Sequence, residues 1–193
     1  MTSHSPAPPE NGPRKKAKNA GLRAKRKRLY TRRGDLGETS LFSGPRVGKD
    51  HPRIETLGAV DELSAFLSLA RAQKLPEKID ILLESIQVKL ISVGTEIAAM
   101  TPSKHDVPVL RPADIRSLED EIDVYDALLP SLTSILIPGT SPQAAALHAA
   151  RAVCRRAERR AVALLRSDAS VSRYLISWLN RLGDLLFVLA RSV

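Results

Sequence analysis

The feature that most constrains the fold is a periodic run of small and aliphatic residues over about 142–167. Six of its positions recur at alternating intervals of three and four residues, which places them on one side of an α-helix: Leu147, Ala150, Cys154, Ala157, Ala161 and Leu164. Ser141 is a good N-terminal cap, and Pro142 suits the first helical position. Such a stripe must be covered by other helices, so the pattern predicts a chain of packed helices.

Four further segments have helical periodicity, over about 54–73, 77–100, 112–128 and 170–191. The residues expected to face the core are Val60, Leu63, Leu67 and Ala70, then Ile81, Ile86, Leu90, Val93 and Ile97, and finally Leu175, Trp178, Leu182, Leu185 and Leu189. Aromatic residues make up only 4% of the chain, and no run alternates convincingly with the period of a strand. We therefore predict an all-α fold, a five-helix bundle with short connections.

The positive charge is concentrated at the N-terminus. The chain carries a net charge of +9, and residues 1–28 hold nine of the 30 Lys and Arg but one of the 21 acidic residues. Rich in Pro and poor in large apolar side chains, this segment is predicted to be a disordered basic tail, followed by one domain over 29–193. We expect it to make at most non-specific contacts with nucleic acid, because the chain lacks aromatic stacking platforms and a recognition-helix motif.

The small number of cysteines and the short apolar segments indicate the cellular setting. Cys154 is the only cysteine, so no disulfide can form within the chain. No apolar run approaches the roughly 18–20 residues that span a bilayer. The tail also lacks the apolar stretch of a secretory signal. A cytoplasmic protein without membrane contact is expected.

Charged residues cluster beside the apolar stripe of the 142–167 segment. Arg151, Arg155, Glu158 and Arg159 share one helical face. The planar guanidinium group matches phosphate with two hydrogen bonds, so this face fits anion binding. A solvated face paired with acids elsewhere explains it equally well.

Asn180 and Asp184 lie four residues apart beside the core of the last helix. Asn is unfavourable inside a helix, so its presence indicates a specific hydrogen bond, either to a ligand or between helices. Phosphate-loop, dinucleotide and zinc motifs are absent from the sequence, and Cys154 fits a packing role. If the chain is an enzyme, its nucleophile comes from a substrate or a cofactor.

Three motifs, in the same order and spanning 29–193, resemble those of the PduO-type ATP:cob(I)alamin adenosyltransferases. The first motif combines three runs: Thr31-Arg32-Arg33-Gly34-Asp35-x-Gly-x-Thr39-Ser40-Leu41, Arg46-Val47-x-Lys49-Asp50 and Gly58-x-Val60-Asp61-Glu62-Leu63. The second is His148-x-Ala-Arg151-x-Val-Cys-Arg155-Arg156-Ala-Glu158-Arg159-Arg160. The third is Leu179-Asn180-Arg181-Leu182-x-Asp184.

The resemblance implies a transferase that moves the adenosyl group of ATP to the cobalt of cob(I)alamin, with Mg²⁺. It implies a homotrimer with sites between subunits, a reductase, and an adenosylcobalamin-dependent mutase or dehydratase as partners. ATP would contact an N-terminal loop and two helices through Thr31, Arg32, Arg33, Gly34, Thr39, Ser40, Lys49, Arg155, Arg156, Glu158, Arg159 and Asn180. Arg151 would pair with Asp61 of a neighbouring subunit on the corrinoid side, and Arg151, Asp61 and Arg155 would be catalytic.

Two positions depart from the family pattern. Ile135 stands where the family usually has a Phe that displaces the lower axial ligand of the corrinoid, and Thr140 stands where it has the second glycine of a turn. Ile is smaller and not flat, so we expect a less efficient displacement, and Thr140 predicts an altered turn. These departures leave open a corrinoid-binding or delivery protein without catalysis.

Overall fold

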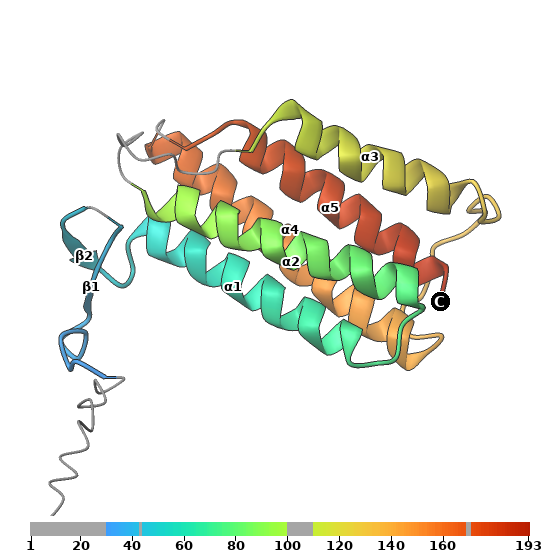
Figure 1. The fold of residues 1–193 in the computed structure, drawn as a ribbon, viewed down its shortest axis with the longest axis horizontal. Helices are drawn as coiled ribbons and strands as arrows, with labels where there is room; N and C mark the ends of the chain where they lie inside the picture. Colours follow the sequence, from blue (N-terminus) through green and yellow to red (C-terminus); the bar gives the residue numbers. More distant parts are fainter. Residues whose placement is uncertain (1–29, 43, 100–109, 169–170) are drawn as a thin grey trace, which may run out of the picture. The chain divides into compact units, whose positions relative to one another are not determined.

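The computed structural model describes residues 30–42, 44–99, 110–168 and 171–193, so the predicted tail over 1–28 lies outside the described residues. The chain divides into two units, residues 1–32 and 33–193. The second unit holds all the helices and strands described below (Figure 1).

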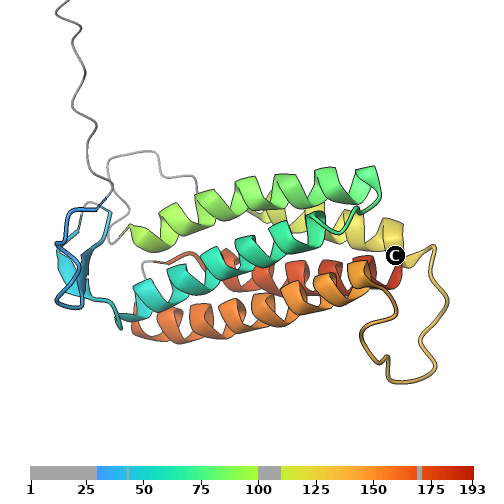
Figure 2. The same ribbon diagram turned by 90° about the horizontal axis from the view of Figure 1, so that it is seen from below.

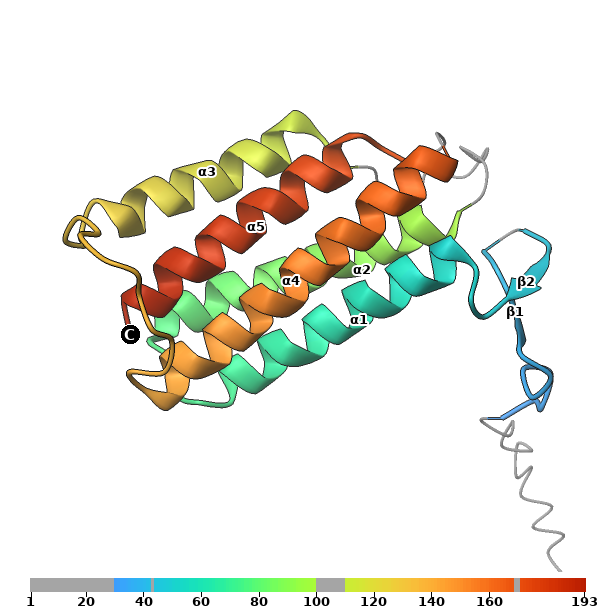
Figure 3. The same ribbon diagram turned by 180° about the vertical axis from the view of Figure 1, so that it is seen from behind.

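Five helices form the second unit, which confirms the predicted all-α bundle. They are α1 (Pro52–Arg71), α2 (Glu77–Ala98), α3 (Pro112–Asp126), α4 (Pro142–Ser167) and α5 (Tyr174–Arg191). Helix α4 packs against both α1 and α5, while α2 packs on α1 and α3 packs on α5 (Figures 2 and 3). As expected, α4 begins at a cap in which the Ser141 hydroxyl accepts a hydrogen bond from the Ala144 amide at 2.9 Å.

The core confirms most of the predicted inward positions. All six residues of the α4 stripe are buried, as are the residues predicted for α1 and α5. One prediction for α2 is wrong, because Ile81 is 58% exposed. Ile79 and Leu83 are buried instead; each is two residues from Ile81 and so lies on nearly the opposite side of the helix. The error arose because Ile81 fits an apolar period that the neighbouring residues fit better.

A short hairpin precedes α1, and the sequence had indicated only a loop there. Strand β1 (Glu38–Ser40) pairs antiparallel with β2 (Arg46–Gly48), with Thr39 opposite Val47. Each strand has three residues, too few for a two-residue alternation to be recognised. The chain then leaves β1 through buried Leu41, and the Phe42 amide donates to the Ala98 oxygen at the end of α2, at 3.1 Å.

The hairpin and the connection between α3 and α4 lie at opposite ends of the bundle (Figures 1 and 3). At the hairpin end, the buried Glu96 carboxylate accepts hydrogen bonds from the Leu110 amide at 3.2 Å and the Ser172 amide at 3.0 Å. Glu96 therefore joins the C-terminal end of α2 to the starts of the segments that lead into α3 and α5. No helix within the described ranges is long and apolar enough to cross a membrane.

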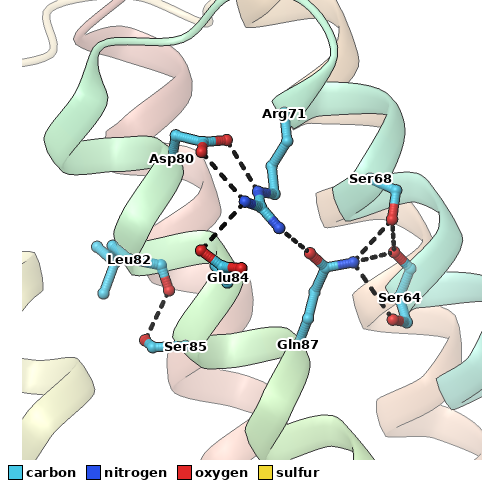
Figure 4. Close-up of polar contacts among 8 residues, drawn as sticks. All are labelled: Ser64, Ser68, Arg71, Asp80, Leu82, Glu84, Ser85 and Gln87. Atoms are coloured by element: carbon cyan, nitrogen blue, oxygen red, sulfur yellow. Dashed lines mark hydrogen bonds and ion pairs between the residues drawn. The ribbon is translucent and has the colours of Figure 1, made fainter.

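At the other end, a polar network joins α1 to α2 (Figure 4). Arg71 donates to both carboxylate oxygens of Asp80, at 2.8 and 3.1 Å, and to the Gln87 side-chain oxygen at 3.0 Å. The Gln87 amide in turn donates to the Ser64 backbone oxygen at 2.9 Å and the Ser68 hydroxyl at 2.8 Å. These bonds fix the register between the two helices.

Candidate functional site

The hairpin brings a glycine-rich turn against a lysine. The Lys49 amide donates to the Gly37 oxygen at 2.8 Å, and a Cβ atom added at Gly34 would lie 3.4 Å from Lys49 Nζ. Gly37 has a φ of +84°, a conformation that glycine adopts without strain. An ammonium group beside open backbone of this kind can hold a phosphate group. Lys49 and Gly34, both predicted to contact ATP, are thus neighbours.

Arg46 fixes this turn, although the prediction of site residues did not include it. Its Nη2 donates to the Arg33 oxygen at 2.7 Å, and its Nε donates to a Glu38 carboxylate oxygen at 3.2 Å. The Arg33 side chain is exposed, so its guanidinium group is accessible to solvent while its carbonyl is held. The signal for Arg46 was its place in the quoted motif, three residues before Lys49.

The other predicted residues of the N-terminal loop fall into two groups. Thr39 is half-buried and Ser40 is exposed, both on β1. Thr31 and Arg32 belong to the unit 1–32. Within that unit Arg32 has a φ of 61°, unusual for a residue with a side chain, and its guanidinium carbon lies 5.6 Å from the centre of the Tyr30 ring.

One side of α4 faces α1 and shares a cavity with Lys49. Arg156 forms an ion pair with Glu62, and Arg160 lies 3.5 Å from Glu55, so both acids of α1 have an arginine partner. With Lys49, these four side chains line a cavity of about 420 Å³. The structure therefore brings Lys49 and Arg156 together in one chain. The pairing acids were missed because they lie on a different helix.

The other side of α4 faces α5 and holds a second cluster. The Asn180 amide donates to Glu158 Oε1 at 3.1 Å, and Arg181 donates to the Asn180 oxygen at 2.9 Å. Arg155 lies 3.9 Å from Glu158 and is 45% exposed. Asn180 therefore makes a bond between helices, one of its two expected roles, and this bond holds Glu158 beside Arg155.

Free cationic groups remain around these clusters. Among the residues that the structure describes, neither Lys49 nor Arg159 has an acidic partner, and both are exposed. Arg155 and Arg156 lie about 100° apart around α4, so the two clusters lie on different sides of this helix. Exposed guanidinium groups on both sides can stabilise negative charge that develops on a bound group.

Arg151 and Asp61 lie on different faces of the bundle. The Arg151 guanidinium carbon lies 5.2 Å from the centre of the Phe187 ring, whose edge meets His148. Burial, and secondly the charge of Arg151, lower the pKa of His148. Asp61 lines an apolar groove between α1 and α2 and is exposed. In the described part of this single chain the two residues form no ion pair with each other.

Ile135 lies in the connection between α3 and α4, at the bundle end opposite the hairpin (Figure 2). It is 95% exposed, and Ile137 is 83% exposed. The left-handed conformation of the turn that follows falls on Gly139, with a φ of +111°, and not on Thr140. Thr140 therefore avoids the positive φ that is costly for a residue with a side chain, and a turn that differs from the family's stays a prediction.

No group of three or more His, Cys, Asp or Glu side chains that could hold a metal ion occurs in the described ranges. Mg²⁺ at nucleotide sites is commonly held by substrate phosphates, waters and one or two carboxylates, so it does not require such a group. Cys154 is fully buried and its Sγ donates to the Leu179 oxygen at 3.3 Å, as expected of a packing residue.

These features define a helical bundle with two cationic clusters along α4 and a glycine–lysine turn at one end. Residues 29–193 match the model of the cobalamin adenosyltransferase family, and the chain belongs to this family. This agrees with the resemblance of the three motifs.

The chain is also similar in sequence to individual corrinoid adenosyltransferases. The corrinoid adenosyltransferase PduO of Citrobacter freundii is 44% identical over 168 residues, 85% of this chain and 49% of the relative. The corrinoid adenosyltransferase of Bacillus subtilis is 39% identical over 170 residues, 86% of each chain. The chain thus spans about half the length of the PduO relatives.

A solved structure shares the fold. A variant of the PduO-type ATP:corrinoid adenosyltransferase from Lactobacillus reuteri, complexed with cobalamin and ATP, is 30% identical. It superimposes with a TM-score of 0.80 over 85% of this chain and 92% of the relative.

Proposed function

We propose that the protein transfers the 5′-deoxyadenosyl group of ATP to the cobalt of cob(I)alamin and releases triphosphate. The cobalt supplies the electron pair for the new cobalt–carbon bond, and the C5′–oxygen bond breaks with its pair leaving on triphosphate. The substrate is itself the nucleophile. This explains why the protein can dispense with a reactive Ser, Cys or His: Cys154 is buried and hydrogen-bonded.

The observation that carries the proposal is the position of the Lys49 ammonium group beside the open side of Gly34. The turn lets backbone approach a phosphate chain closely, and the Lys49 ammonium group, which has no acidic partner in the described structure, can bind it. Thr39 and Ser40 on β1 add hydroxyl donors near the same turn. We assign Thr31, Arg32 and Arg33 to the same nucleotide loop on the basis of the family motif.

The arginines of α4 would stabilise the leaving triphosphate. Arg155, held beside the Glu158–Asn180 pair, and Arg159 present charge from one side of the helix, and Arg156 presents charge from the other. Preorganised cations of this kind lower the barrier because charge on the leaving group grows during the reaction. Mg²⁺ would be coordinated by the phosphate oxygens and would neutralise part of that charge.

We further propose that the working form is a homotrimer whose sites lie between subunits. The hairpin and the Ile135 loop occupy opposite ends of one bundle, and Asp61 and Arg151 occupy different faces. A neighbouring copy can bring these parts together, with Arg151 pairing to the neighbour's Asp61 on the corrinoid side. A reductase would supply the substrate, and a mutase or dehydratase would receive the product. A cytoplasmic setting fits the unpaired thiol of Cys154.

The decisive experiment is an anaerobic spectrophotometric assay with purified protein, Mg-ATP and chemically reduced cobalamin. We expect the spectrum of cob(I)alamin to convert to that of light-sensitive adenosylcobalamin, with triphosphate formed in equal amount. Arg155→Ala should greatly reduce turnover while circular dichroism remains unchanged. Corrinoid and ATP binding without product would favour the alternative of a delivery protein.

A further inference from the structure

The residue that fastens the nucleotide hairpin to the bundle is Arg53, which none of the site predictions included. It lies in the first turn of α1, four residues after Lys49, and its side chain is fully buried. A guanidinium group is rarely buried without several partners, because removing it from water is costly. The contacts of Arg53 therefore show which parts of the fold its buried guanidinium group joins.

Arg53 binds the ends of two other helices. Its Nε donates to Asp168 Oδ2 at 2.8 Å, and its Nη2 lies 2.6 Å from the same oxygen. Asp168 caps the C-terminal end of α4. The Nη1 of Arg53 donates to the oxygens of Ile97 and Ala99 at the C-terminal end of α2, both at 2.6 Å. Helix C-termini leave carbonyls without partners, so a cation is favoured there.

The hairpin is bound to the same stretch of backbone at the end of α2. The Arg53 side chain donates to the backbone oxygens of Ile97 and Ala99. The Phe42 amide donates to the backbone oxygen of Ala98, the residue between them, at 3.1 Å. Phe42 also forms a β-bridge with Ala99. The strand that carries Thr39 and Ser40 thus ends on a short stretch of backbone whose position Arg53 sets.

Arg53 also fixes the other end of the hairpin. After β2 the chain passes Lys49 and enters α1 at His51, whose Nδ1 accepts a hydrogen bond from the Arg53 amide at 3.2 Å. The backbone and side chain of one residue therefore secure both connections between hairpin and bundle. Lys49 shares its cavity with Arg156 of α4, so a displaced hairpin would change the spacing of these two cations.

We propose that Arg53, with Asp168, is a positioning residue for ATP: it holds the hairpin at the distance from α4 at which Lys49 and the arginines bind one triphosphate. The inference rests on the proposed function and adds to it a group that touches no substrate. Its loss should weaken ATP binding and leave the chemistry at saturating ATP largely intact.

The chain offers a matched control in Arg71. This residue also joins α1 to α2 and makes a two-pronged contact with an aspartate, Asp80 (Figure 4). It is the last residue of α1, about 27 Å along the helix from Arg53. Arg→Lys at either site keeps the charge but removes the planar fork. Both variants lose a helix-to-helix contact, and only one of them lies at the hairpin.

The experiment compares Arg53→Lys, Arg71→Lys and the unchanged protein. KM for ATP and kcat come from the cobalamin assay, Mg-ATP affinity without corrinoid comes from calorimetry, and hydrogen exchange follows the Phe42 amide. For Arg53→Lys we expect KM and Kd for ATP to rise about tenfold, as for the loss of a charged hydrogen bond. We also expect faster Phe42 exchange and kcat within about twofold. Arg71→Lys should change only the melting temperature.

Two outcomes would overturn the inference. One is an equal fall in melting temperature for both variants with ATP affinity and Phe42 exchange unchanged. The other is an equal rise in KM for both. If Arg53→Lys does not fold, Asp168→Asn, which keeps an oxygen acceptor at a part-exposed position, is judged by the same readouts. Failure of the unchanged protein to bind Mg-ATP would instead refute the proposed function, which separates the two failures.

Discussion

Asn180 of α5 donates to Glu158 Oε1 of α4 at 3.1 Å, while Oε2 of the same carboxylate lies 3.9 Å from Arg155 Nη1. A carboxylate with a competing donor neutralises its arginine less. The bond between the two helices therefore maintains the positive charge that the proposed ATP site requires.

Asn180→Ala should weaken ATP binding. Without its amide donor Glu158 can turn to Arg155, and we expect KM for ATP to rise by about tenfold, corresponding to one charged hydrogen bond. Glu119→Gln is a suitable control, because it removes the charge of another partner of Arg181 without touching Glu158. Steady-state kinetics of both variants provide the test, and equal effects would contradict a specific role for Asn180.

A mixture of two inactive variants should recover activity. Asp61→Ala and Arg151→Ala each remove one partner of the proposed ion pair between neighbouring subunits, so a site whose Asp61 and Arg151 come from different chains can be intact in a mixed trimer. Refolding the two together at equal amounts should restore about a quarter of the sites. A mixture as inactive as either variant alone would place both residues in the site of a single chain.

Ile135→Phe should speed the reaction that starts from cob(II)alamin. By resemblance to the family, a flat ring at this exposed position displaces the lower axial ligand of the corrinoid better than Ile does. The rate from chemically prepared cob(I)alamin and the KM for ATP should hardly change. Ile137→Phe, two residues further along the same loop and also exposed, controls for added apolar surface.

Glu96 should make stability depend on pH. Burial raises its pKa above the usual 4.5, although the Leu110 and Ser172 amides partly oppose this. Since the folded state then binds the proton more tightly than the unfolded state, this contribution to stability is complete below pH 4.5 and is lost as pH rises through the folded pKa. Urea unfolding across this range should show the loss, and Glu96→Gln should remove it.

Cys154 should resist thiol reagents in the native protein. Burial raises its pKa from 9.0 to about 12, so the reactive thiolate is scarce and inaccessible at pH 8. Ellman's reagent should react only after denaturation, with one thiol per chain. Because the folded pKa is the higher one, the stability associated with this thiol is complete below pH 9 and is lost between pH 9 and about 12. Rapid native labelling would contradict this assignment.

The helices and their buried faces could be predicted because periodicity reports burial directly. The α4 stripe and its Ser141 cap are examples, whereas Ile81 shows that an apolar residue can fit the period and still face solvent. The hairpin escaped prediction because its strands are three residues long. Arg53 escaped it because a single charged residue at a helix start gives no sequence signal of burial; its partners lie 44 to 115 residues away.

The candidate site was predicted mainly through motif resemblance. Spacing alone placed Arg155, Glu158 and Arg159 on one face but left anion binding and a solvated face equally open. What the three-dimensional structure adds is the division of α4 into two sides, with Arg156 paired to Glu62 and Arg155 beside Glu158. That division depends on which helices flank α4, which the sequence of α4 does not contain.

The inward face of α4 is built largely from alanine, with Ala150, Ala157 and Ala161 fully buried. Small side chains let neighbouring helices approach the α4 backbone closely, so little side-chain volume separates them. The arginines on this helix are therefore placed by backbone distances more than by the shapes of neighbouring side chains. Exchanging aliphatic residues on α1 and α5 should therefore leave the charges in place, whereas enlarging one of these alanines should displace the whole helix and its cations together.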